Sequence, residues 1–135
     1  MTDLGKMEAK RLRFERLWNI LGVGFVLLVI YLSLTPELPD IAVSANQKIG
    51  HVLAYGWLML WFAQLYRSSR IRLALAAAFC ALGIALEYLQ GMTGFRGFEY
   101  SDMLLNSAGV VIGLALARTP LQNGLQRLEW ILTTR

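Results

Sequence analysis

Four runs of apolar residues, each close to the length that crosses a lipid bilayer, constrain what this sequence can fold into. A helix rises about 1.5 Å per residue, so roughly 20 residues are needed to cross the hydrocarbon layer. The runs cover residues 17–34, 49–66, 73–90 and 103–117. We therefore expect residues 1–135 to form a single transmembrane domain, an all-α, polytopic four-helix bundle.

The chain around the fourth run needs separate treatment, because this run is shorter than the other three. It either recruits flanking residues such as Asp102 and Arg118 or lies where the bilayer is thinned. Beyond it, leucines recur at helical spacing, which indicates a short C-terminal helix at the membrane interface. These leucines are Leu121, Leu125, Leu128 and Leu132.

The composition agrees with a membrane protein. Hydrophobic residues make up 56% of the chain and charged residues only 16%, too few for an ordinary water-exposed surface. The single cysteine, Cys80, lies in an apolar run, so a disulfide framework and a cysteine-based metal site are excluded. We interpret Cys80 as a packing residue.

Positive charges are distributed unequally between the two sides that the four runs define. Of the thirteen Lys and Arg residues, all but Lys48 and Arg96 precede the first run, lie between the second and third, or follow the fourth. Cytoplasmic loops carry the excess of such residues, so we expect a multi-pass membrane protein with both termini in the cytoplasm. The basic N-terminal segment is interpreted as a topology anchor, with no nucleic-acid partner.

Polar residues interrupt the last three runs three or four residues apart, which places them on one face of each helix. All three faces lie at the extracytoplasmic end, whereas Asn19 and Gln64 are the only strongly polar residues near the inner side. Charged groups and glycines on one face are typical of helix–helix contacts, so we expect the faces to meet in a polar chamber that opens outward. The faces consist of Lys48, His51 and Tyr55; Gly83, Glu87 and Gln90; and Asp102, Asn106, Gly109 and Gly113.

This pattern resembles the VanZ-like family of small bacterial membrane proteins, named after an accessory factor in glycopeptide (teicoplanin) resistance. The resemblance lies in KIGHVLAY, GIALEYLQ, an Arg six residues after Gln90, and DMLLNSAGVVIG, which begins six residues after that Arg. It covers about half of the chain, and Gln47 stands where the family often has Asp. The resemblance implies that the family's characteristic polar residues are here Lys48, His51, Tyr55, Glu87, Gln90, Arg96, Asp102, Asn106 and Gly109.

We interpret the chamber as a site that recognises an anionic lipid or a lipid-linked envelope precursor at the outer leaflet. Lys48 and Arg96 would contact phosphate, while the uncharged and acidic groups would hold sugar, amine or peptide. The resemblance implies a protein of the bacterial inner membrane with a role in glycopeptide susceptibility, because the family's named member acts in resistance to antibiotics that bind envelope precursors. The predicted ligand-binding residues are Lys48, His51, Tyr55, Glu87, Gln90, Arg96, Asp102 and Asn106.

A membrane enzyme acting on a lipid-linked phosphate or ester is an alternative. His51 with Glu87 or Asp102 would form a general acid–base pair, which makes these three the candidate catalytic residues. The sequence has no GxSxG nucleophile motif and no HExxH zinc motif, so whether a reaction is catalysed stays open. We expect no metal and no cofactor.

A purely structural interpretation also stays open. The polar residues would then only fix helix packing, through pairs such as Glu87 with Arg96 or Asp102 with Lys48 or Asn106. Transport is disfavoured, because no polar path crosses the inner half of the bundle.

The pair formed by Gly109 and Gly113 has GxxxG spacing. This spacing serves either a homo-oligomer contact or close packing against the chain's own third run.

Overall fold

The computed structural model describes residues 11–36, 44–94 and 98–134. Every regular element in these ranges is a helix, which confirms the all-α prediction. Each of the four apolar runs lies in one long helix, except that the second and fourth runs extend one residue beyond the C-terminal end of their helix. The elements are α2 (Glu15–Leu34), α3 (Ser44–Leu65), α4 (Ser69–Thr93), α5 (Tyr100–Leu116), the 3₁₀ helix η1 (Pro120–Asn123) and α6 (Gly124–Thr133).

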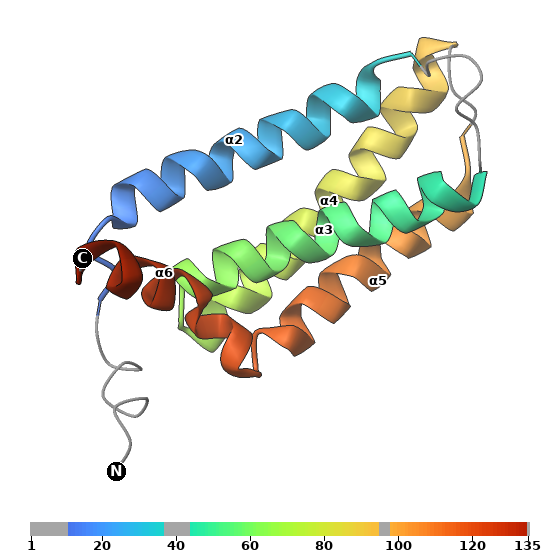
Figure 1. Cartoon of the computed structure of the whole chain (residues 1–135). Coiled ribbons are helices and arrows are strands. Elements are labelled where there is room, and N and C mark those ends of the chain that lie inside the picture. Colours follow the sequence, from blue (N-terminus) through green and yellow to red (C-terminus); the bar gives the residue numbers. More distant parts are fainter. Residues whose placement is uncertain (1–10, 37–43, 95–97, 135) are drawn as a thin grey trace.

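The four long helices alternate in direction, with α3 in contact with each of the other three (Figure 1). The C-terminal ends of α2 and α4 and the N-terminal ends of α3 and α5 gather at one end of the bundle, which we call the His51 end. The opposite end, which α6 covers, is called the Glu129 end. Only residues 66–68 join α3 to α4, a short connection of the kind found in antiparallel bundles.

Local chemistry explains why two helices stop at the His51 end. The backbone N–H and the hydroxyl of Thr35 both donate to the Tyr31 carbonyl oxygen, at 3.0 and 2.6 Å. Pro36 follows and favours the extended backbone that Thr35 adopts (φ −76°, ψ 138°). Helix α4 ends at Gly94, whose φ of 72° lies in the left-handed region that glycine adopts without steric strain.

Helices α3 and α5 approach each other through three glycines. A Cβ atom added to Gly109 would come within 2.5 Å of the Val52 carbonyl oxygen, and one added to Gly113 within 2.5 Å of the Gly56 carbonyl oxygen. Side chains at these positions would therefore push the backbones apart. The intramolecular interpretation of the GxxxG pair named the third run as its partner, and this was wrong: the partner is α3, from the second run. The homo-oligomer contact stays a prediction.

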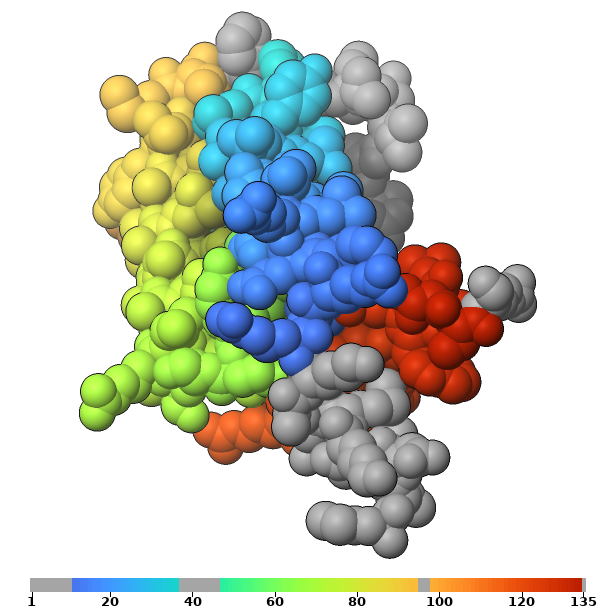
Figure 2. Space-filling model, turned by 90° about the vertical axis from the view of Figure 1, so that its left-hand side faces the viewer, coloured from blue at the N-terminus to red at the C-terminus, as the bar shows by residue number. Residues whose placement is uncertain are grey.

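Large apolar side chains cover much of the outside of the bundle. Ile20, Leu53 and Leu104 are 69%, 65% and 73% exposed. Figure 2 shows α2 on the outside, with α4 along one flank and α6 near its N-terminal end. So many exposed large apolar side chains are unusual for a protein in water but normal for a protein in lipid.

Two helices within the described residues, α2 and α4, are long and apolar enough to cross a membrane. Helix α5 together with η1 and α6 would be a third span if that pair, bent by 77°, is one broken span. Helix α3 has 22 residues but begins with a polar stretch that includes Gln47, Lys48 and His51. Four crossings therefore stay a prediction, as do the orientation and the interfacial position of α6.

The Glu129 end carries a polar network that the sequence did not reveal. The carboxylate of Glu129, which is 7% exposed, accepts hydrogen bonds from the backbone N–H groups of Arg13 and Phe14, at 2.7 and 2.8 Å. It also accepts one from Nε1 of Trp18, at 2.7 Å. Glu129 thus satisfies donors at the start of α2 and ties the last helix to the first long one.

At the same end, the guanidinium group of Arg72 donates hydrogen bonds to carbonyl oxygens at the C-termini of two helices. Arg72 donates to the carbonyl oxygens of Ala63 and Tyr66, at 2.6 and 2.9 Å, near the end of α3. It also reaches the carbonyl oxygen of Ala117 at the end of α5, at 3.4 Å. Strongly polar residues near this end are therefore not limited to Asn19 and Gln64, contrary to the expectation from the sequence.

Candidate functional site

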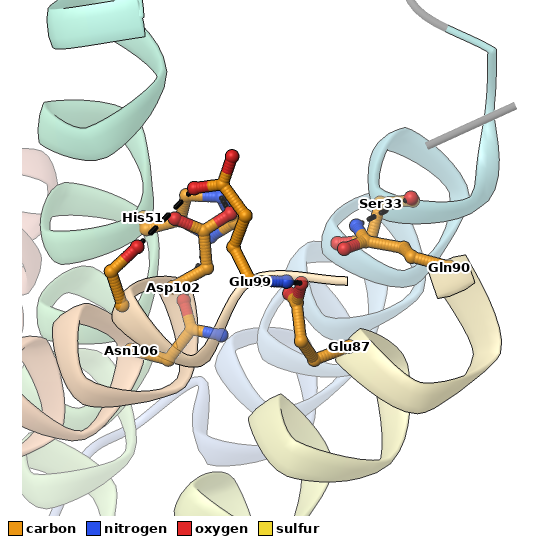
Figure 3. A network of polar contacts seen from close by, with 8 residues as sticks. Ser33, His51, Glu87, Gln90, Glu99, Asp102 and Asn106 are labelled. Carbon is orange, nitrogen blue, oxygen red and sulfur yellow. Dashed lines mark hydrogen bonds and ion pairs between the residues drawn. The ribbon is translucent and has the colours of Figure 1, made fainter. Parts of the chain in front are cut away.

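Three side chains from α3 and α5 form the centre of the polar cluster at the His51 end (Figure 3). Nδ1 of His51 lies 2.8 Å from Oδ1 of Asn106, and Nε2 of His51 lies 3.4 Å from Oδ2 of Asp102. Asp102 and Asn106 are one turn apart on α5, so their side chains share the helix face that meets α3. Both oxygens are acceptors, so His51 donates to both only when each ring nitrogen carries a proton.

Among the described residues, the centre of the cluster is partly exposed at His51 and Asp102. The side chains of His51 and Asp102 are 17% and 18% exposed, whereas Asn106 behind them is buried. Glu99, immediately before α5, is also exposed, and its carboxylate accepts a hydrogen bond from the Ser101 hydroxyl at 3.2 Å. A ligand approaching this end would therefore meet His51, Asp102 and Glu99 first.

Glu87 of α4 lies inside the cluster and is 1% exposed. Its Oε1 accepts a hydrogen bond from the backbone N–H of Glu99, at 2.8 Å. This bond places a carboxylate at the start of α5, where the helix dipole favours negative charge. Glu87 therefore positions the first turn of α5, including Asp102, in addition to any contact with a ligand.

Gln90, one turn further along α4, has a different task. Its Nε2 donates to the carbonyl oxygen of Ser33 in the last turn of α2, at 2.7 Å. Figure 3 shows this contact apart from the group around His51. Gln90 thus holds the end of α2 against α4, and its predicted role in ligand binding stays a prediction.

Tyr55 lies one turn deeper than His51 on α3 and is 2% exposed. Its hydroxyl oxygen is buried and has no hydrogen-bond partner among the described residues. A Cβ atom added to Gly83 would come within 3.3 Å of the Tyr55 ring and 3.0 Å of the Asn106 side chain. Because Gly83 has no side chain, α4 can pack closely against Tyr55 of α3 and Asn106 of α5 at this point.

The two predicted cationic residues are placed differently. Lys48 is exposed and precedes His51 by three residues, one turn towards the start of α3. Asp102 forms its ion pair with His51, not with Lys48. Arg96 lies outside the described residues, so its predicted pairing with Glu87 and its role with phosphate stay predictions.

The predicted convergence of three helix faces is confirmed for His51, Tyr55, Glu87, Asp102 and Asn106. Sequence reasoning missed Glu99, Ser101 and Ser33. The first two flank Tyr100 at the start of α5, where an acidic residue next to a helix N-terminus was the available signal. Ser33 contributes only its backbone carbonyl oxygen, which no side-chain pattern reveals.

Within the described part of the chain, no group of three or more His, Cys, Asp or Glu side chains is arranged to hold a metal ion.

Comparison with known proteins finds similarity over most of the chain. The model of a family described as VanZ/LLP1 matches residues 7–121. An uncharacterized protein of Schizosaccharomyces pombe is 31% identical over 103 residues, which are 73% of this chain and 62% of the yeast protein. This chain therefore spans less than two thirds of the length of that relative. No solved structure matches.

Proposed function

The chain belongs to the VanZ/LLP1 family, and we propose that this membrane protein recognises the headgroup of an anionic lipid or a lipid-linked envelope precursor. The binding site is the polar cluster at the His51 end, on the membrane side opposite the two termini. If the ligand is an envelope precursor, its capture also alters glycopeptide susceptibility.

The observation that carries the proposal is the partly exposed ion pair of His51 and Asp102 on a buried polar base. Interhelical hydrogen bonds in membranes contribute only about 0.6 kcal/mol each, so packing alone is a weak reason to keep several ionisable groups there. Ionisable side chains within membrane helices usually mark a ligand or ion site. Exposure at His51 and Asp102 gives such a ligand a point of contact.

Lys48 supplies the positive charge that an anionic headgroup needs. It is exposed and lies one turn from His51, so its ammonium group is available to a phosphate at the rim of the cluster. Arg96, in the segment between α4 and α5, is assigned the same role in this proposal.

The geometry supports recognition better than acid–base catalysis. A general base needs a ring nitrogen free to accept a proton from the substrate. Both ring nitrogens of His51 already face oxygen atoms, those of Asn106 and Asp102. The enzymatic alternative would require His51 to leave one of these partners.

Mass spectrometry of the amphiphiles that co-purify with the wild-type protein tests the proposal, beside a Glu87→Gln variant. Gln keeps an oxygen that can accept the bond from the Glu99 backbone, so the substitution removes charge and little else. Glu15→Gln, at the Glu129 end, is the matched control. We expect a species enriched in wild type and control but lost in Glu87→Gln; the same bulk lipid profile in all three would overturn the proposal.

A further inference from the structure

Carboxylates dominate the cluster that a ligand would meet at the His51 end. Asp102, Glu99 and His51 all lie near enough to Glu87 to interact with it electrostatically. Three acidic side chains thus surround one imidazole, so the acidic groups outnumber the single basic ring even when it is protonated, and the nearest described lysine, Lys48, lies one turn outside. A phosphate placed among these carboxylates would be repelled, whereas a cation would be attracted.

We infer that the part of the ligand that enters the polar cluster is a primary ammonium group, joined by a short linker to a phosphate that stays beside Lys48. This inference rests on the proposed headgroup recognition and narrows it: the headgroup keeps its anionic phosphate but also carries an ammonium group, so its net charge need not be negative. The ammonium group lies between the carboxylates of Asp102 and Glu99, with the buried Glu87 carboxylate behind them.

The hydroxyl of Tyr55 is an independent observation that points to a ligand group. It is buried and without a hydrogen-bond partner among the described residues, and it interacts electrostatically with Glu87. Leaving a buried polar group unpaired is unfavourable, so such a group is normally satisfied by a ligand or by water. An N–H of the ammonium group that reaches Glu87 supplies a donor for the Tyr55 oxygen.

The spacing along α3 fits a headgroup with charges of both signs. Lys48 and His51 are three residues apart, a rise of about 4.5 Å along the helix. A two-carbon linker between phosphate and ammonium spans a similar distance. Phosphatidylethanolamine carries this arrangement, whereas phosphatidylglycerol has hydroxyls in place of the ammonium, and phosphatidylcholine has a quaternary nitrogen without N–H donors.

Native mass spectrometry with these three lipids, all with the same acyl chains, tests the inference on the full chain. We expect wild type to retain phosphatidylethanolamine about tenfold more than either competitor, because a hydrogen bond to a charged group is typically worth that much. Asp102→Asn and Glu99→Gln each remove the preference, whereas Glu15→Gln keeps it. Glu99 is exposed, so its variant tests the idea even if Asp102→Asn lowers stability.

The outcomes separate the inference from the proposed function. If wild type retains phosphatidylglycerol as well as phosphatidylethanolamine, and Lys48→Ala weakens both, the ammonium inference is overturned and headgroup recognition stands. If all three lipids are retained equally by wild type and every variant, and the co-purified profiles also agree, both are overturned.

Discussion

The α carbon of Gly109 lies so close to α3 that a Cβ atom there would come within 2.5 Å of the Val52 carbonyl oxygen. Gly109→Ala therefore forces α3 and α5 apart, and we expect the free energy of unfolding to fall by about 1–3 kcal/mol. Thermal unfolding in detergent measures this change.

Gly24→Ala is the matched control, because a Cβ atom there meets nothing within 4 Å. Alanine is the better helix former by roughly 1 kcal/mol, so the control should be neutral or more stable. Equal melting temperatures for Gly109→Ala and wild type, with a loss of dimers in the variant only, would favour the homo-oligomer contact instead.

Glu129→Ala should destabilise the protein more than any substitution of an exposed charge. It leaves the N–H groups of Arg13 and Phe14 and the indole of Trp18 without their acceptor. Hydrogen bonds to charged groups contribute about 1.5–3 kcal/mol each, and the fully buried indole donor is the most costly to leave unpaired. Unfolding experiments should show part of this loss in Glu129→Gln, which keeps one oxygen, and none in the exposed Arg127→Ala. An unchanged melting temperature for Glu129→Ala would contradict the anchoring role.

The helices could be predicted from the sequence because a bilayer demands long apolar runs, and each run is a local signal. The meeting of His51 with Asp102 and Asn106 could also be predicted, since three- and four-residue spacing fixes the helix faces. Glu129 could not, because it joins residues more than 110 positions away and no local pattern marks such a contact. The packing of Gly109 against α3 was missed for a similar reason: GxxxG spacing predicts a close approach without naming the partner.

His51→Gln separates ligand recognition from a purely structural role for the cluster. Because single interhelical contacts in membranes are weak, we expect the melting temperature to change little. Retention of the co-purified headgroup ligand should fall about tenfold or more, because the ion pair that orders Asp102 is lost. Lipid mass spectrometry and thermal unfolding on the same samples measure both effects, with the exposed Arg70→Gln at the Glu129 end as the control. Marked destabilisation with ligand retention unchanged would favour the structural interpretation.

The number of membrane crossings depends on α3, which contains the polar residues Gln47, Lys48 and His51 and is not among the helices that are apolar enough to cross on their own. Its neighbours α2, α4 and α5 surround it, so much of its surface faces protein instead of lipid. A helix in that position crosses a membrane without being apolar all round. We therefore expect four crossings, with the Glu129 end in the cytoplasm.

Single cysteines in a Cys80→Ser background test this topology with a membrane-impermeant maleimide on intact cells. Met92→Cys, 81% exposed near the end of α4, should react from outside. Ser68→Cys, between α3 and α4, and Thr134→Cys, after α6, should react only after the membrane is permeabilised. Labelling of Ser68→Cys from outside would mean that α3 does not cross, and the polar cluster would then lack the bilayer setting on which the proposed headgroup recognition depends.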